Sequence, residues 1–366
     1  MNLVIFGDID RWSDAVNILT KYRPDIHIIG LCSLDLGDYK NSSATVTLRE
    51  ALDLFHQGQI DGIININGEN FHYFSLLENL GFFPVYVLPS YFSLQEELGK
   101  IASGERFIYP YKDILPELMQ LEFHLADHCN LNCKGCTHFS NLVPSPVFAN
   151  FIPFQNDIRR LASLFSHIHT FYLLGGEPLL NPDVKDYVNV IRDSFPYSQI
   201  ILVTNGILLL SMKPELISFL RTNRVHLSIS AYDCLDTEKI AAFIRQHGLL
   251  ADLRVEKGCF SKFLNPKGDS NPLEIFEQCS RKNCTFLGQG RVAACCMPFV
   301  IQYFNQYFHE SIPELESIDL YEPNLTGHEL QKRLIAPMEL CRFCSKDVDF
   351  PWEISSPPYK KEDWCV

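Results

Sequence analysis

Three cysteines, Cys129, Cys133 and Cys136, are the residues of this chain best suited to chemistry. They are separated by three and then two residues, in the stretch C-N-L-N-C-K-G-C. Cysteine thiolates are the usual ligands of iron–sulfur clusters, and a [4Fe–4S] cube needs four to occupy every corner. Three thiolates at this spacing therefore predict a [4Fe–4S] cluster with one iron open to a small-molecule ligand.

Two simpler interpretations compete with the cluster. A structural zinc site takes four ligands, and His128 or His138 is a possible fourth beside the three thiols; the cysteines could also be ordinary buried thiols. Position favours the cluster, because residues 121–126 read as a buried strand and the cysteines follow it directly. Metal and substrate sites of parallel barrels gather at that end of the strands.

Further motifs follow at the ends of later predicted strands. They are Gly175, Gly176, Glu177 and Pro178 after the second strand, Thr204, Asn205 and Gly206 after the third, and Ser228 and Ser230 on the fourth. With the cysteine loop, this order resembles the radical S-adenosylmethionine (SAM) enzymes, whose loop follows the first strand of a partial (β/α) barrel. The resemblance implies that the amino and carboxylate groups of SAM chelate the open iron.

The residue types suit such a ligand. Paired glycines let backbone carbonyls approach closely, and the Glu177 carboxylate suits the SAM ammonium. Ser228 and Ser230 share one side of a strand and suit ribose hydroxyls or a carboxylate. Taken singly, each position is equally consistent with an ordinary turn or a core serine.

One position departs from the family pattern. Gly135 precedes the third cysteine, where the family usually has an aromatic residue against the adenine. We therefore expect the adenine to pack elsewhere, for example on Phe139.

Composition indicates a globular protein with two or three domains. The chain has 366 residues, of which 46% are hydrophobic and 20% charged, enough to bury a sizeable core. Its 31 basic and 44 acidic residues give a net charge of −13, which disfavours nucleic acid as a partner.

The thirteen cysteines are expected to be reduced. Residues 1–7 show no secretory signal, and no apolar run has the length of a membrane span. We therefore expect a cytoplasmic protein with no membrane partner, whose thiols serve metal binding.

The predicted fold class is α/β, in three domains. Residues 1–112 alternate strands and helices as in a Rossmann-like parallel α/β domain. The first turn, Gly7-Asp8-Ile9-Asp10, lacks the G-x-G-x-x-G of nucleotide-binding folds, so docking or substrate delivery is favoured, although Asp35 could still hold a ribose. Residues 118–258 are predicted to form the radical SAM partial barrel.

Residues 259–366 are predicted to form a small cysteine-rich domain. Cys295 ends a predicted hairpin strand that begins at Gly290, and Cys341 and Cys344 form a C-x2-C pair. This pattern is similar to the auxiliary-cluster domain called twitch, a reduced SPASM domain, which implies a second [4Fe–4S] cluster. Cys279 is the preferred fourth ligand and Cys284 the alternative; four thiols would bind zinc equally well.

The remaining cysteines lie outside these two sets. Cys296 and Cys365 are spare thiols or a ligand at an open corner, and Cys32 fits the core of the first sheet. Cys234 and Cys259 follow the fourth and fifth barrel strands, where a thiol could donate a hydrogen atom to a substrate radical, as in family epimerases. An inert buried cysteine is the simpler interpretation of each.

The resemblance implies cleavage of SAM to a 5′-deoxyadenosyl radical, which removes hydrogen from a substrate carbon. We expect a radical SAM oxidoreductase that oxidises an alcohol of a small-molecule substrate, namely a sugar, nucleotide sugar, polyol or glycan precursor. The expected base is His124, Arg254 or Glu256, and the expected electron donor is a flavodoxin or ferredoxin. The alternatives are an epimerase, a peptide-modifying maturase and a zinc-stabilised binding scaffold.

Overall fold

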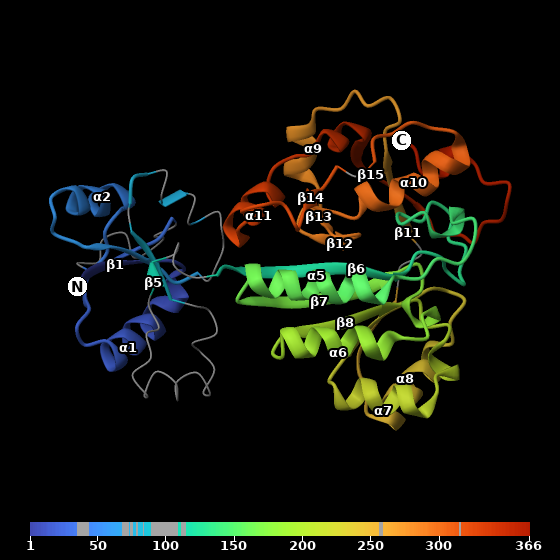
Figure 1. Cartoon of the computed structure of the whole chain (residues 1–366), viewed down its shortest axis with the longest axis horizontal. Helices are drawn as coiled ribbons and strands as arrows, with labels where there is room; N and C mark the ends of the chain where they lie inside the picture. Colours follow the sequence, from blue (N-terminus) through green and yellow to red (C-terminus); the bar gives the residue numbers. More distant parts are fainter. Residues whose placement is uncertain are drawn as a thin grey trace. The chain divides into compact units, whose positions relative to one another are not determined.

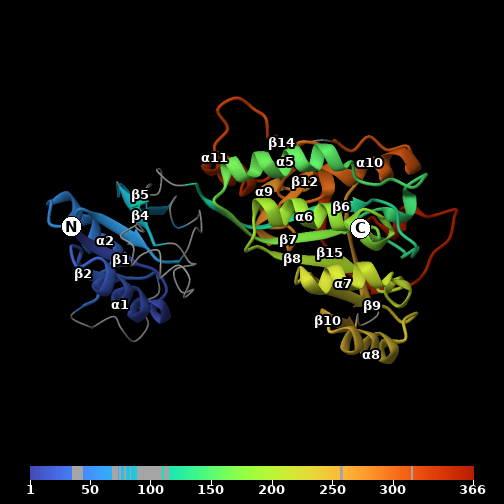
Figure 2. The ribbon, with the colours of Figure 1, turned by 60° about the horizontal axis from the view of Figure 1, so that its bottom comes forward.

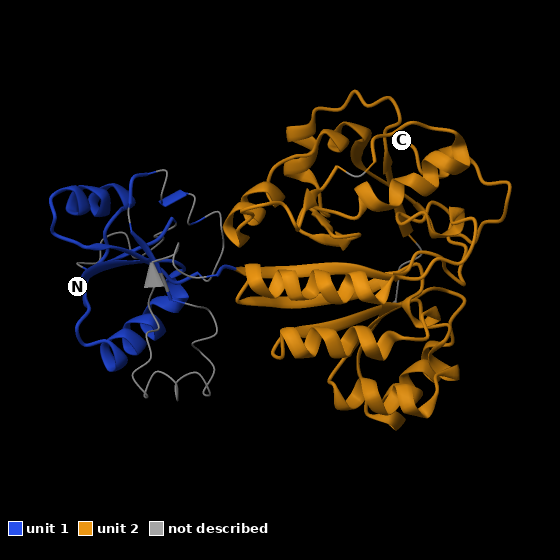
Figure 3. Ribbon diagram, viewed as in Figure 1, with its two compact units in different colours: residues 1–116 blue, residues 117–366 orange. Residues whose placement is uncertain are grey.

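The computed structural model describes residues 1–34, 44–67, 73, 76–77, 80–82, 84–88, 109–110, 115–255, 259–314 and 316–366. The chain divides into two compact units, Met1–Pro116 and Glu117–Val366 (Figure 3). Among the described helices, none is both long and apolar enough to cross a membrane.

The first unit is built on one sheet with helices on both faces. Its strand order is β2-β1-β3-β4-β5, with β1 to β4 parallel and β5 antiparallel to β4. Hydrophobic side chains of β1 alternate between the faces: Leu3 and Ile5 pack against α1, while Val4 and Phe6 pack on the side of α2. The elements are β1 (Asn2–Phe6), α1 (Trp12–Tyr22), β2 (His27–Cys32), α2 (Leu48–His56), β3 (Gly62–Asn65), β4 (Val85–Val87) and β5 (Tyr109–Pro110).

This arrangement confirms the predicted parallel α/β architecture of the front of the chain. Cys32 is fully buried, as a core residue of the sheet should be. Asp35, the proposed ribose contact, lies outside the described residues.

The second unit contains a larger sheet in the order β10-β9-β8-β7-β6-β12-β13-β14 (Figures 1 and 2). Strands β6 to β10 are parallel neighbours in chain order, the pattern of successive βα units. They are β6 (Glu117–Ala126), β7 (His167–Gly175), β8 (Gln199–Thr204), β9 (His226–Ala231) and β10 (Leu250–Val255). The connecting helices are α5 (Phe151–Leu164), α6 (Val184–Ser194), α7 (Pro214–Thr222) and α8 (Thr237–His247).

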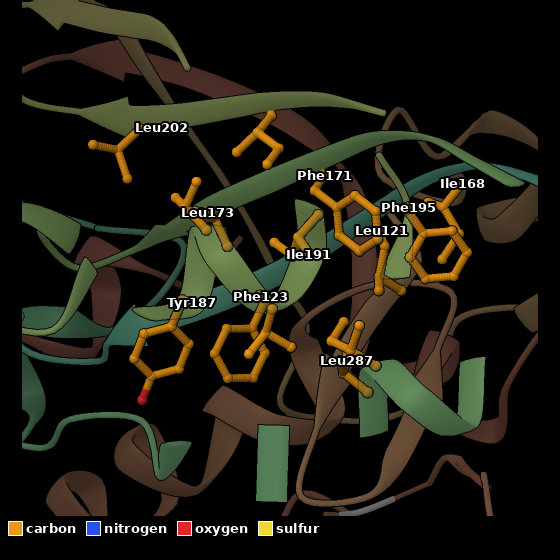
Figure 4. Packing of buried hydrophobic residues seen from close by; sticks show 14 of the residues in the cluster. Leu121, Phe123, Ile168, Phe171, Leu173, Tyr187, Ile191, Phe195, Leu202 and Leu287 are labelled. Carbon is orange, nitrogen blue, oxygen red and sulfur yellow. The ribbon is translucent and has the colours of Figure 1, made fainter. Parts of the chain in front are cut away.

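Alternate residues of these strands pack against the helices. In β6, Leu121 and Phe123 belong to the main hydrophobic core together with Tyr187 and Ile191 of α6 (Figure 4). Because successive side chains of a strand point to opposite faces, Glu122 and His124 project to the other side of the sheet. The five parallel strands thus have one helix-covered face and one face that carries polar groups.

Residues after 258 extend the same sheet. β12 (Phe286–Gly288) pairs in parallel with β6, and the hairpin partner β13 (Arg291–Ala293) pairs with β14 (Ile318–Asp319). The predicted segments 118–258 and 259–366 therefore share one sheet within one compact unit, so their status as separate domains stays a prediction.

A second, smaller core lies in the C-terminal part. The antiparallel pair β11 (Cys259–Leu264) and β15 (Cys344–Pro351) packs near α10 (Met297–Phe308). The other helices here are α9 (Pro272–Gln278) and α11 (Gly327–Leu334). Eight residues of α10 are buried, so its polar stripe is narrow and gives a weak periodic signal in the sequence.

Candidate functional site

Ends of four strands meet around a cavity of about 230 Å³. The cysteine loop after β6 supplies Cys129, Cys133 and Cys136 to its lining. Other lining residues are Gly175 and Gly176 at the end of β7, Thr204 and Asn205 at the end of β8, and Ser230 of β9. The structure thus brings together most of the cluster and SAM residues that the sequence predicted, at the carboxyl edge of parallel strands.

The three thiols lie close enough to influence one another. Burial raises the pKa of Cys129 to about 12, and the nearby Cys136 adds to the shift. Burial likewise raises the pKa of Cys133 to about 12. Metal ligation requires thiolates, so cluster assembly here must release protons from thiols that otherwise hold them. Three soft sulfur donors around one cavity fit an iron–sulfur cluster.

Among the described residues, no three His, Cys, Asp or Glu side chains converge closely enough for a single metal ion. A [4Fe–4S] cube holds its thiolates at separate corners, farther apart than the ligands of one ion. The absence of a single-ion site among the described residues is therefore compatible with a [4Fe–4S] cluster at the cysteine loop.

The Glu177 carboxylate forms hydrogen bonds within the protein. Its side chain is fully buried and does not line the cavity. The carboxylate accepts hydrogen bonds from the Thr204 hydroxyl (2.7 Å), the Asn205 backbone N–H (2.9 Å) and the Leu179 backbone N–H (3.0 Å). Glu177 thus joins the end of β7 to the end of β8, while its contact with the SAM ammonium stays a prediction.

The paired glycines are required by the chain itself. Gly175 has a φ of 140°, and a Cβ there would collide with the Ala126 carbonyl oxygen. A Cβ on Gly176 would collide with the His128 carbonyl oxygen, and the Gly176 N–H donates to Ala126 O at 2.8 Å. These glycines therefore let the cysteine loop lie directly against the end of β7, and Pro178 begins the short helical turn Pro178–Leu180.

Asn205 reaches across to the cysteine loop. Its amide Nδ2 donates to Asn130 Oδ1 at 2.8 Å and lies 3.5 Å from the Cys129 sulfur. Ser228 is buried and accepts a hydrogen bond from Arg254 Nη2 at 2.5 Å. Of the two serines, Ser230 lines the cavity and Ser228 does not.

The aromatic residues of the cavity are Tyr232 and Phe260, which the sequence analysis did not identify. Phe139 is fully buried among Phe304 and Trp364, so its expected contact with adenine is wrong. Sequence periodicity could not find Tyr232 or Phe260, because Tyr232 directly follows the end of β9 whereas Phe260 lies in β11, and only the fold brings the two together. Their rings lie 5.8 Å apart, edge to face.

The unusual glycine of the cysteine loop also has a structural cause. A Cβ on Gly135 would lie 2.5 Å from the Asp363 carbonyl oxygen and 2.6 Å from the Phe350 ring. We expect Gly135→Phe, which restores the usual family aromatic, to lose iron because its ring collides with the C-terminal segment. Iron analysis after anaerobic reconstitution measures this. Normal iron content in the variant would contradict the expectation.

A second cavity, of about 280 Å³, collects four other cysteines. Cys279, Cys295, Cys341 and Cys344 all line it. Burial raises the pKa of Cys344 to about 12, with Cys341 and Cys279 adding to the shift. Cys284 does not line this cavity and interacts with the Glu122 carboxylate. The preferred four cysteines thus line one cavity, whereas the alternative Cys284 lies near Cys295 and Cys279 without lining it.

The predicted bases have different surroundings. His124 is buried, and its Nδ1 lies 2.8 Å from Asp127 Oδ1; no described atom is a hydrogen-bond partner of its Nε2. Arg254 is exposed, and Glu256 lies outside the described residues. Glu122, on the same face of β6 as His124, was missed by the sequence analysis; burial raises its pKa, which suits a proton acceptor.

The predicted hydrogen donors are both exposed. Cys234 lies near enough to Cys133 to raise the pKa of that thiol, whereas Cys259 begins β11 beside the cavity residue Phe260. Neither thiol lines the cavity itself.

Residues 124–249 match the family model described as the Radical SAM superfamily. The chain carries a radical SAM domain. Such a domain uses a [4Fe–4S] cluster and SAM, so the predicted superfamily and these two cofactors are confirmed. The matched segment runs from β6 to the end of α8 and so contains every residue of the cysteine loop.

Curated relatives of the radical SAM domain are similar over short stretches. The chain is 30% identical to the Molybdenum cofactor biosynthesis protein 1 of Dictyostelium discoideum over 130 residues, covering 35% of this chain and 20% of the relative. It is 29% identical to the GTP 3′,8-cyclase of Limosilactobacillus fermentum over 110 residues, covering 30% and 32%. The chain thus spans a third or less of these two relatives.

Similar solved structures are more distant. BtrN in complex with AdoMet and 2-DOIA is 15% identical, with a TM-score of 0.39, over 62% of this chain and 92% of that one. The enzyme anSMEcpe with bound AdoMet and a peptide is 20% identical, with a TM-score of 0.31, over 38% and 42%.

Proposed function

We propose that this radical SAM enzyme oxidises an alcohol of a sugar, polyol or related glycan precursor with the help of a second cluster. The observation that carries the proposal is the grouping of the cysteines into two sets. One set of three lies at the strand ends beside a cavity, and one set of four lines another cavity in the same compact unit.

Cys129, Cys133 and Cys136 would hold the first cluster, and the adjoining cavity would hold SAM. The residues that line this cavity include Gly175, Gly176, Thr204, Asn205 and Ser230. Tyr232 and Phe260 supply the aromatic surface that suits an adenine. Glu177 and Asn205 act as positioning residues, because they tie the ends of β7 and β8 to one another and to the cysteine loop.

Cys279, Cys295, Cys341 and Cys344 would hold the second cluster. When bound, these groups would supply the radical chemistry that removes one hydrogen atom from the carbinol carbon and a site for the electron that remains. The hydroxyl proton must then pass to a base, which leaves a carbonyl product. The polar face of β6 offers His124 and Glu122 for this role, in a buried setting that excludes water.

The test removes one thiol of the second cysteine set and asks whether SAM cleavage continues without product formation. After anaerobic reconstitution, Cys344→Ala should still cleave SAM when reduced chemically, but should contain about four fewer iron atoms and form no carbonyl product. Cys284→Ala is the matched control, because its thiol lies outside the second cavity; it should retain iron and product. Carbonyl formation by Cys344→Ala would refute the proposed role of the second set.

A second candidate follows from the names of the relatives, several of which are GTP 3′,8-cyclases. Under this alternative the substrate is a guanine nucleotide, and the reaction is a cyclisation. Anaerobic incubation with GTP, SAM and a reductant distinguishes the two, because a cyclised nucleotide would favour the alternative. Consumption of a sugar alcohol with GTP left intact would favour the oxidation.

An epimerase remains a further alternative, since Cys234 lies near Cys133. It requires a thiol that returns hydrogen to the substrate radical. Cys234→Ala and Cys259→Ala are each expected to leave the oxidation intact. Loss of product in one variant, with SAM cleavage retained, would support the epimerase.

A further inference from the structure

The segment after β15 lies against the cysteine loop although more than 200 residues separate them in sequence. Cys133 forms an antiparallel bridge with Ile354. On either side of it, the Lys134 N–H donates to Glu353 O and the Ser355 N–H donates to Asn132 O, both at 2.8 Å. The cysteine loop is therefore held by main-chain hydrogen bonds to residues 353–355, in a register that also fixes the preceding Trp352.

Trp352 packs against Tyr232, one of the residues that line the cavity. The two rings are stacked, with centroids 4.9 Å apart and an angle of 12° between their planes. Tyr232 lines the cavity and Trp352 does not. The indole therefore supports the aromatic wall without occupying the space that we assign to SAM.

The indole N–H points into a buried environment. Among the described residues, no atom accepts from Trp352 Nε1 with full hydrogen-bond geometry. The Cys133 thiol lies within reach of the indole, and Cys133 bridges Ile354, two residues after Trp352. A buried donor without an oxygen or nitrogen acceptor is costly, and a cluster thiolate would satisfy it.

We infer that Trp352 is a positioning residue of the radical SAM cluster, whose indole N–H donates to the Cys133 thiolate and whose ring fixes Tyr232. This inference rests on the proposed cluster at Cys129, Cys133 and Cys136. A hydrogen bond to a ligating sulfur draws charge from the cluster, so it stabilises the more negative reduced form and raises the reduction potential.

Trp352→Phe separates the hydrogen bond of the indole from its stacking on Tyr232, because phenylalanine keeps an aromatic face and removes the N–H. The midpoint potential would be measured by redox titration of the EPR signal that changes on SAM addition, which distinguishes this cluster from the second one. We expect the reduced-to-oxidised ratio at a fixed solution potential to fall about tenfold, equivalent to about 59 mV for one electron. SAM affinity should be retained in Trp352→Phe and weakened in Trp352→Leu, which removes the stack as well.

Trp12→Phe is the matched control, since Trp12 lies in the first compact unit and donates to the Gly7 carbonyl. It should leave the potential unchanged. A wild-type potential in Trp352→Phe, with iron present, would overturn the inference while leaving the proposed function intact. Wild-type protein without a SAM-sensitive EPR signal would instead refute the proposed cluster.

A variant that loses iron is also informative. Trp352→His restores a ring N–H at this position. If Trp352→Phe loses its cluster and Trp352→His retains it, the donor role is supported. If both lose the cluster, the indole acts only through packing, and the inference is overturned.

Discussion

Cys136→Ala is expected to abolish SAM cleavage and to lower the iron and sulfide content by about four atoms each per chain. The three-cysteine loop has no spare thiol, because Cys234 is exposed and does not line the cavity. The measurements are iron and sulfide analysis after anaerobic reconstitution, and 5′-deoxyadenosine release under a chemical reductant.

The control is Cys32→Ala, which removes a buried thiol from the sheet of the first unit. It should contain as much iron as the wild type and cleave SAM normally. Release of 5′-deoxyadenosine by Cys136→Ala at the wild-type rate would contradict the assignment of this thiol to the cluster.

Glu177→Ala is expected to destabilise the second unit by roughly 3–5 kcal/mol, because it leaves three donors without their buried acceptor. These donors are the Thr204 hydroxyl and the backbone N–H groups of Asn205 and Leu179. Anaerobic urea titration, followed by the visible absorbance of the cluster, measures the loss as a lower midpoint.

An exposed glutamate of the same unit provides the comparison. Glu215→Ala, in the first turn of α7, should change the free energy of unfolding by less than about 0.5 kcal/mol. Equal midpoints for Glu177→Ala and the wild type would show that the buried carboxylate does not hold β7 and β8 together.

The parallel strands could be predicted from sequence because each is a short apolar run followed by a turn. The strand expected at residues 121–126 forms the second half of β6. The pairing of β12 with β6 was missed because it joins segments far apart in the chain. α10 was missed because eight of its residues are buried, which leaves a weak amphipathic pattern.

The sequence predicted which residues lie at the site, but it did not predict the contacts that each residue makes. Spacing identified the cysteine loop and the motifs at the strand ends, because these features are local. It could not reveal that the Glu177 carboxylate is already bound by backbone donors, since those donors come from β8. Tyr232, Phe260 and Trp352 have no common sequence signal, because only the fold brings them together.

The hydrogen bond from Trp364 Nε1 to the Cys136 carbonyl, 2.9 Å long, joins residues 228 positions apart. During translation, Cys136 therefore emerges from the ribosome long before the residues that complete its surroundings. Iron delivered to the nascent chain would encounter the cysteine loop before Trp364 is available to cover it. Maturation of an enclosed cluster must accordingly wait until this distant tryptophan has been synthesised and has docked.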